Sequence, residues 1–296
     1  PFLAVALQSM IDNCSPENTY LVKILNTDIS EENKRKIGKY ERENVDIEFV
    51  DLNYYIKKVK DKLYTRDYYS ATTYFRLFLP NLYPQYDKVL YLDSDIVILD
   101  DIAKLYNTDM GDNLVAAAPD DAVLSSPIFC DYVEKVVGVA DCRKYFNAGV
   151  LLMNLDAMRR GNLRQKWEEL SKIRMYYQDQ DMLNISCKGK IYHLPAKYNR
   201  FAYFSDEEYG QFVAEGLYTQ EERREAVETP TIIHYAADKP WKRYDGNLCS
   251  LWWDYVNSQN DLQGLFDEEK ARKYHGPTFW EKVVRKLHKL VSKEKL

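Results

Sequence analysis

Short runs of apolar and β-branched residues, each about as long as a β-strand, recur along the chain and alternate with segments of helical spacing. This alternation predicts an α/β fold, in which helices cover a central and mostly parallel sheet. Because the runs are almost continuously apolar, we expect the strands to be buried on both faces. The predicted strands are Thr19–Leu25, Ile47–Leu52, Lys88–Leu92, Leu114–Ala118, Gly149–Asn154, Ile191–Leu194 and Thr231–Tyr235. The predicted helices lie at Pro127–Val137, Leu163–Ile173, Asp181–Cys187 and in the charged segment Glu31–Glu43, which Ser30 would cap.

The composition is that of an ordinary globular protein, with 46% of the 296 residues hydrophobic and 29% charged. No stretch reaches the roughly 18 to 20 uncharged apolar residues that a membrane-spanning helix needs. The net charge of −5 argues against a nucleic-acid-binding protein. Since no internal repeat or low-complexity linker divides the chain, we expect one domain at residues 1–248, followed by a helical region at residues 249–296.

The cysteines favour a reducing compartment. There are five of them, irregularly spaced, and no two form a CxxC pair. The apolar N-terminus, Pro1–Met10, lacks the basic region and the cleavage site of a signal peptide. We therefore expect a cytoplasmic protein. The cysteines are Cys14, Cys130, Cys142, Cys187 and Cys249.

The end of the chain, residues 276–296, has a basic amphipathic pattern. It contains six basic residues against two acidic ones, and Trp280 heads a row of apolar residues at helical spacing. This pattern is typical of a helix in a membrane interface, where each basic residue contributes about 1 kcal/mol near an anionic leaflet. It predicts a peripheral attachment to an anionic surface at the inner face of the plasma membrane. A helix packed on the domain, with solvated charges, explains the same pattern.

Two aspartates stand between two groups of core-forming residues. The strand Lys88–Leu92 ends in Asp93-Ser94-Asp95, and the apolar residues 96–99 follow at once. Buried carboxylates are unfavourable unless a partner compensates their charge. Alternate residues of a strand share one face, so both side chains can reach one cation, and oxygen ligands suit Mg²⁺ or Mn²⁺ bound to substrate phosphates. A pair of turn or capping aspartates explains the same residues without a metal.

A second polar group follows the last predicted strand. His234 lies near its end, and a neutral imidazole beside carboxylates favours Mn²⁺ over Mg²⁺. Lys239 follows in a turn before Pro240-Trp241, where its point charge suits a phosphate. A histidine at a strand end is also common as a hydrogen-bonded structural residue.

Two further polar segments lie beside predicted strands or helices. Asn147 precedes the strand Gly149–Asn154, and its amide can donate to and accept from sugar hydroxyls, although a turn asparagine beside Gly149 explains it equally. The segment Gln178-Asp179-Gln180-Asp181 opens a helix, where acidic residues commonly cap the end, and we expect Asp181 to do so.

Taken together and in this order, these segments resemble family 8 of the retaining glycosyltransferases, which includes lipopolysaccharide galactosyl- and glucosyltransferases and the related glycogenins. The likeness covers roughly residues 1–253, and each motif is weak alone but the ordered set is specific. The matching segments are Thr73–Leu77, Tyr91–Asp95, Phe146–Leu151, Asp179–Asp181, His234-Tyr235 and Lys239–Trp241.

The resemblance implies a single Rossmann-like GT-A domain that moves galactose or glucose from a UDP-sugar to a hydroxyl of a glycan or lipid-linked acceptor. It also implies Mn²⁺ dependence, with Mg²⁺ as a substitute, and a role in making lipopolysaccharide, capsule or another cell-surface glycan. By position, the metal ligands would be Asp93, Asp95 and His234. Substrate-binding residues would be Arg76, Asp93, Ser94, Asn147, Ala237 and Lys239, and catalytic residues would be Asp120, Asp179 and Gln180, of which Gln180 lies nearest the anomeric carbon.

The chain departs from the family pattern at two places. Ala237 stands where the family often has glycine, in a phosphate loop that is shorter than in some members. The family's domain begins with a strand that ends near an Asp-x-Asn sequence, whereas Pro1-Phe2-Leu3 already resembles the helix after it, so we expect that strand to be missing.

Several alternatives remain open at this point. The same fold could bind a nucleotide sugar without turnover, and a metal-dependent nucleotidyltransferase also places paired carboxylates after strands, although no Gly-rich phosphate loop is visible. For a transferase, front-face attack and a covalent intermediate through Asp179 both retain configuration. We expect the acceptor near Tyr198–Tyr218 and the 240s.

Overall fold

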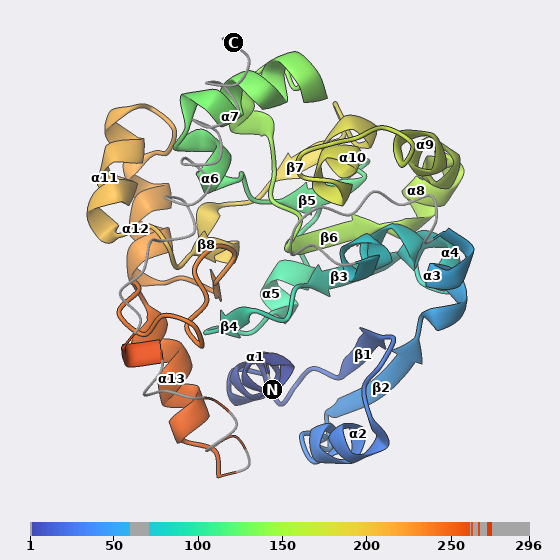
Figure 1. Cartoon of the computed structure of the whole chain (residues 1–296), viewed down its shortest axis with the longest axis vertical. Coiled ribbons are helices and arrows are strands. Elements are labelled where there is room, and N and C mark those ends of the chain that lie inside the picture. The colour runs from blue at the N-terminus through green and yellow to red at the C-terminus, as the bar shows by residue number, and fades with distance from the viewer. Residues whose placement is uncertain (1, 60–70, 261, 263–265, 267–270, 274–296) are drawn as a thin grey trace.

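The computed structural model describes residues 2–59, 71–260, 262, 266 and 271–273 (Figure 1). The strands are β1 (Tyr20–Asn26), β2 (Val45–Asp51), β3 (Lys88–Leu92), β4 (Ile96–Ile98), β5 (Val115–Ala117), β6 (Val150–Asn154), β7 (Ile191–His193), β8 (Arg200–Phe201) and β9 (Ile232–His234). The α-helices are α1 (Phe2–Asp12), α2 (Glu31–Gly38), α3 (Asn53–Val59), α4 (Leu79–Leu82), α5 (Ala103–Tyr106), α6 (Asp121–Leu124), α7 (Pro127–Tyr132), α8 (Leu155–Arg160), α9 (Leu163–Leu170), α10 (Asp179–Ser186), α11 (Asp206–Ala214), α12 (Gln220–Glu228) and α13 (Cys249–Asn257). The 3₁₀-helices are η2 (Ala71–Phe78), η4 (Cys142–Lys144) and η5 (Ala196–Tyr198), and η3 (Val133–Val137) is a π-helical turn.

Every strand predicted from the sequence is present; Lys88–Leu92 has the predicted ends, and the ends of the others are shifted by two residues at most. Ser30 caps α2 as expected, because its side chain accepts a hydrogen bond from Asn33 N, but the helix ends at Gly38 rather than at Glu43. The predicted helix Pro127–Val137 is divided into α7 and the π-helical turn η3. Strands β4 and β8 were not predicted, because each is only two or three residues long and neither shows a strand's alternation.

The strand directions differ from the expectation of a mostly parallel sheet. In the four-stranded order β3-β6-β5-β7, β6 runs antiparallel to both β3 and β5, and only β5 and β7 are parallel. Beside it, β4 and β9 are antiparallel while β9 and β8 are parallel, and β1 pairs in parallel with β2. The sheet is therefore mixed. A continuous apolar run, typical of parallel strands, reflects burial on both faces, and the buried antiparallel strand β6 shows the same run.

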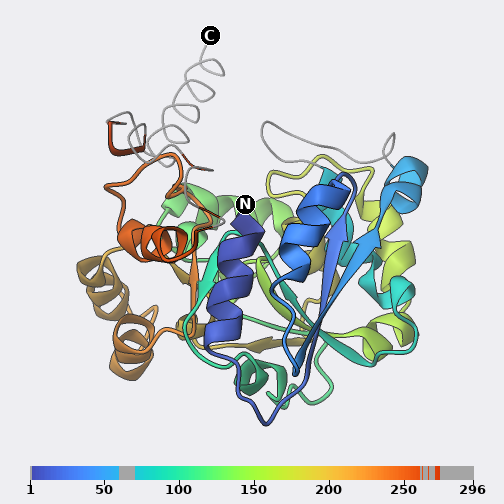
Figure 2. The same ribbon diagram turned by 90° about the horizontal axis from the view of Figure 1, so that it is seen from below.

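Helices cover both faces of the four-stranded sheet (Figures 1 and 2). Alternate residues of β6 point to opposite faces. Leu151 and Met153 pack into a core with residues of α8, α9 and α10, whereas Val150 and Leu152 pack into a second core with residues of α1, β1 and β2. The loops at the ends of these buried strands are thereby held in fixed positions, and they carry the polar residues described below.

The region after residue 248 begins with α13, whose Trp252, Trp253 and Val256 pack against α1 and β9. The predicted division of the chain at residue 248 stays a prediction. The basic segment 276–296 lies outside the described residues, so its membrane attachment also stays a prediction. Within the described part of the chain, no helix combines the length and apolar character that crossing a membrane requires.

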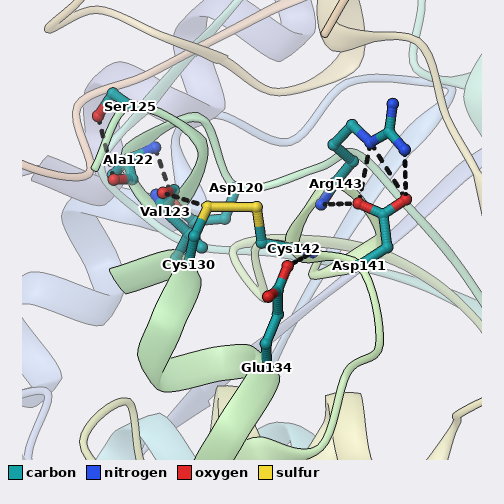
Figure 3. The surroundings of a disulfide bond; sticks show 9 residues. All are labelled: Asp120, Ala122, Val123, Ser125, Cys130, Glu134, Asp141, Cys142 and Arg143. Atoms are coloured by element: carbon teal, nitrogen blue, oxygen red, sulfur yellow. Dashed lines mark hydrogen bonds and ion pairs between the residues drawn. A yellow bond between two sulfur atoms is a disulfide. The ribbon is translucent and has the colours of Figure 1, made fainter. Parts of the chain in front are cut away.

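A disulfide joins two cysteines whose spacing carries no signal for pairing. Cys130 on α7 is bonded to Cys142 in η4, with their Cα atoms 5.1 Å apart (Figure 3). The backbone N–H of Cys142 also donates to Glu134 Oε1 at 3.1 Å. This disulfide does not agree with the reducing compartment that the cysteine pattern favoured. Twelve positions separate them, and only the turn from η3 to η4 brings the sulfur atoms together.

Candidate active site

Strand pairing brings the two aspartates and the histidine together. Ile96 of β4 lies opposite His234 of β9, and Tyr235 N donates to the Asp95 carbonyl at 2.9 Å. The side chains of Asp93, Asp95 and His234 each offer a ligand atom, and these atoms lie within 4.8 Å of one another. Two carboxylate oxygens and one imidazole nitrogen form a donor set that suits Mn²⁺.

Lys239 supplies the positive charge beside Asp95, and His234 is its second neighbour. Lys239 Nζ forms an ion pair with Asp95 Oδ2 and also donates to the Tyr235 carbonyl at 2.6 Å, while His234 Nε2 lies 3.4 Å from Asp95 Oδ1. Burial opposes ionisation of Asp95, but the Lys239 ammonium outweighs it and holds the pKa of its carboxyl well below its usual range. Asp95 is therefore ionised and available to a cation at neutral pH.

Arg76 on η2 is a buried cation that links two carboxylates. Its Nη2 lies 3.2 Å from Asp93 Oδ1, its Nε lies 3.0 Å from Asp179 Oδ2, and its Nη1 donates to the Ala148 carbonyl. Burial raises the pKa of Asp179 to about 6, with Arg76 opposing that rise and Asp93 adding to it. Arg76 thus orients Asp93 on the metal side and Asp179 on the helix side of the site.

Three buried polar side chains next to this group satisfy one another. Asn147 Nδ2 donates to Asp120 Oδ2 at 3.1 Å and to Gln180 Oε1 at 3.2 Å. Gln180 Nε2 donates to Asp120 Oδ2 at 2.9 Å and to the Tyr145 hydroxyl at 3.2 Å. Asp120 Oδ1 caps α6 by accepting from the backbone N–H groups of Ala122 and Val123. The hydrogen-bonding positions of these amides are therefore already occupied within the protein.

The structure brings together nearly all residues predicted for the site. Ser94 lies exposed in the turn between the two aspartates, and Ala237 lies buried in the loop between His234 and Lys239. The expectation that Asp181 caps α10 is wrong, because no side-chain cap forms there; Asp181 instead accepts from Tyr177 N, which precedes the helix, at 2.8 Å and from the hydroxyls of Tyr132 and Tyr145 at 2.7 and 2.6 Å. The roles assigned to these residues stay predictions.

Sequence reasoning missed two members of this network. Tyr145 lies between Asp181 and Gln180, and Asn199 lies between Asn147 and His234. Asn199 directly precedes β8, a strand of two residues, so no local pattern marked it. Tyr145 stood beside the Phe146-Asn147 motif and could have been found there, although an aromatic residue before a buried strand usually indicates packing.

A buried carboxylate beside the site makes stability depend on pH. Asp121 is 1% exposed and accepts from the hydroxyls of Tyr209 and Tyr218 at 2.6 and 2.5 Å. Burial raises its pKa to about 7, the tyrosine hydrogen bonds opposing the rise. The folded state thus holds the proton more tightly than the unfolded chain, where aspartates titrate near ~3.9. The stability that this gives is fully present near pH ~4 and is lost as the pH rises through about 7.

We expect Asp121→Asn to remove that dependence, because an amide does not titrate. The quantity to compare is the free energy of unfolding of the wild type minus that of the variant. Since each unit of pKa shift is worth about 1.4 kcal/mol, this difference should fall by on the order of 1 to 4 kcal/mol as the pH rises from ~4 to ~8. Urea unfolding of both proteins at several pH values measures this difference. Curves that run parallel across the range would contradict the expectation.

The chain is similar in sequence to known glycosyltransferases. The family described as glycosyl transferase family 8 matches residues 1–245. A Haemophilus influenzae protein named as a glycosyltransferase is 30% identical over 206 residues, which cover 67% of this chain and 59% of that protein. The lipopolysaccharide 1,2-glucosyltransferase of Escherichia coli is 29% identical over 181 residues, which cover 60% of this chain and 51% of that protein. The chain thus spans little more than half the length of these two relatives.

Among solved structures, galactosyltransferase LgtC in complex with donor and acceptor sugar analogues aligns with a TM-score of 0.69 and 29% identity. That alignment covers 88% of this chain and 92% of LgtC. The chain belongs to glycosyltransferase family 8. This confirms the predicted family, the glycosyltransferase class and the GT-A fold.

Proposed function

We propose that the chain is a retaining, Mn²⁺-dependent transferase that moves galactose or glucose from a UDP-sugar to a hydroxyl of a glycan or lipid-linked acceptor in cell-surface glycan synthesis. One observation carries the proposal: Asp93, Asp95 and His234 converge within 4.8 Å beside the Lys239 ammonium. Such a group holds a divalent ion and a diphosphate together. The Escherichia coli relative, named for glucosyl transfer to lipopolysaccharide, and LgtC, named for galactosyl transfer, support the choice of sugar and acceptor class.

The ion, when bound, supplies a Lewis acid that offsets negative charge on the departing diphosphate. Lys239 adds a positive charge at the same place, next to Asp95. Arg76 is engaged with Asp93, Asp179 and a backbone carbonyl, so its function in the proposal is to hold the carboxylates in position. The main-chain segment Asn147–Gly149 borders the same space, since Gly149 O accepts from Asp93 N at 2.8 Å.

The proposed chemistry is front-face attack, in which the leaving phosphate takes the acceptor's proton. A covalent route needs a free carboxylate beside the sugar. Asp179 is paired with Arg76, Asp120 accepts four hydrogen bonds, and Asp181 accepts three. These partners hold each carboxylate in a fixed orientation, so none of the three is a free carboxylate beside the sugar. The Gln180 amide is a poor nucleophile, and both of its ends are bonded.

A pocket of about 170 Å³ next to the phosphate loop is the proposed acceptor site. Its lining includes Tyr203, Asp238 and Asn247, and Asp238 directly precedes Lys239. An aromatic ring with nearby carboxylate and amide groups suits a sugar, which has both apolar faces and hydroxyls. Apart from Asp238, the residues that line the pocket come from the two regions, Tyr198–Tyr218 and the 240s, where we expected the acceptor.

A panel of UDP-sugars tests the donor and the metal together. UDP release should be fastest with UDP-galactose or UDP-glucose and Mn²⁺, slower with Mg²⁺, and absent with EDTA. The anomeric configuration of the product, read by NMR, should match that of the donor.

Two other results would favour the alternatives. Tight binding of UDP and Mn²⁺ without hydrolysis or transfer, across the panel and a set of glycan acceptors, would indicate a binding module. Formation of a UDP-sugar from UTP and a sugar phosphate would indicate a nucleotidyltransferase.

A further inference from the structure

Two consecutive backbone N–H groups fix the orientation of the amides in the site. Gly149 N donates to Asn147 Oδ1 at 2.9 Å, and Ala148 N donates to Gln180 Oε1 at 2.9 Å. A backbone N–H can only donate, so the atom that faces each of them must be an amide oxygen. The NH₂ groups of both side chains therefore point away from these two peptide groups.

Asn199 extends this chain of oriented hydrogen bonds to His234. Its Nδ2 donates to Asn147 Oδ1 at 3.0 Å, which leaves its own Oδ1 2.8 Å from His234 Nδ1. An amide oxygen has no hydrogen to give, so His234 Nδ1 must be the donor in this bond. A neutral ring then has its lone pair on Nε2, the nitrogen that lies 3.4 Å from Asp95 Oδ1.

The surroundings of Asn199 exclude the opposite orientation of its amide. The residue is 1% exposed, and it directly precedes β8, where Phe201 pairs with His234. A reversed amide would set its oxygen against Asn147 Oδ1, an oxygen that already accepts from Gly149. Two buried oxygens facing each other would lose a hydrogen bond, at a cost of about 1 to 3 kcal/mol.

We propose that Asn199 is a positioning residue for metal binding. It keeps a proton on His234 Nδ1, so that the Nε2 lone pair faces the two aspartates. It also connects His234 to Asn147 through hydrogen bonds. Partners of this kind set the orientation and basicity of a histidine ligand. The inference rests on the metal role given to His234 above. Its first test needs no metal, which separates the two proposals.

Nitrogen chemical shifts of the imidazole rings report directly which nitrogen carries the proton. The chain has four histidines, and His234→Gln assigns the His234 signals by their loss. At pH ~8 without metal, we expect Nδ1 of His234 to be protonated in the wild type, because Asn199 accepts from it. In Asn199→Ala we expect the proton to move to Nε2, which then faces Asp95 Oδ1.

Affinity for Mn²⁺ in the presence of UDP, measured by electron paramagnetic resonance, is the second readout. Asn199→Ala should weaken it about 10- to 100-fold. Asn199→Asp keeps an oxygen for the His234 proton and should bind Mn²⁺ nearly as well as the wild type. Its second oxygen would face Asn147 Oδ1, so UDP release at saturating Mn²⁺ should still be slower. The matched control is Asn26→Ala, because the buried Asn26 amide donates to the Ile24 and Val50 carbonyls, with no further side-chain bond among the described residues, and it should leave Mn²⁺ affinity unchanged.

The outcomes divide as follows. A protonated Nδ1 and normal Mn²⁺ affinity in Asn199→Ala would overturn the inference. Equal losses of Mn²⁺ affinity in Asn199→Ala and Asn199→Asp would also overturn it, because they would reduce Asn199 to a packing role. A wild-type protein with protonated Nδ1 that binds no Mn²⁺ would support the tautomer assignment and contradict the proposed function instead.

Discussion

Asp95→Ala should lower turnover at saturating Mn²⁺ by at least about a hundredfold, the scale of losing one electrostatic stabiliser worth roughly 3 kcal/mol. The substitution removes a metal ligand and also the ion-pair partner of Lys239, whose ammonium then loses its fixed place beside the site. Mn²⁺ affinity should fall as well. Steady-state UDP release across a Mn²⁺ titration measures both effects, and thermal unfolding shows whether the variant remains folded.

Asp100→Ala is the matched control for this experiment. Asp100 lies beyond the other end of β4 and forms an ion pair with a lysine, Lys104, at 2.7 Å, but this pair is more exposed than Asp95 and Lys239 and lies outside the metal triad. An exposed pair of this kind contributes little to stability. We expect its turnover and Mn²⁺ affinity to equal those of the wild type. Near-normal turnover of Asp95→Ala with Mn²⁺ would contradict the metal assignment.

The residues of the metal triad could be predicted because each is marked locally in the sequence. Asp93 and Asp95 interrupt core-forming residues, and His234 ends an apolar run. Their meeting follows from the pairing of β4 with β9, and that pairing was not predictable, since Ile96–Ile98 is too short to show alternation. The order of family motifs supplied the missing long-range information.

The hydrogen-bond network around these residues could not be predicted in the same way. Asn147 and Gln180 were expected to face the donor sugar, and their chemistry allows it. The structure shows that their amides already bond to Asp120, Asn199 and main-chain N–H groups. Such saturation depends on distances between segments far apart in the chain. The disulfide between α7 and η4 and the antiparallel direction of β6 also depend on contacts between separate segments, so they could not be predicted either.

Gly149→Ala should disable the site through a single methyl group. A Cβ at this position would lie 2.3 Å from His234 Cε1 and 3.0 Å from both Asp93 Oδ2 and Asn147 Oδ1. The imidazole is 2% exposed, contacts the Phe201 ring edge-to-face and is bonded at Nδ1, so it has no room to retreat. We expect a loss of about 1 to 3 kcal/mol in unfolding free energy from overpacking, and at least about tenfold weaker Mn²⁺ binding.

Gly38→Ala separates the effect of this contact from that of removing any glycine. Gly38 ends α2, and a Cβ there meets nothing within 4 Å, so the substitution should be neutral or slightly stabilising. Unfolding curves and Mn²⁺ titrations of both variants provide the comparison. If Gly149→Ala folds and binds Mn²⁺ like Gly38→Ala, then His234 does not need its observed position, and its role as a ligand fails. If Gly149→Ala folds but loses Mn²⁺, the close approach of this glycine to the histidine is required for the metal site itself.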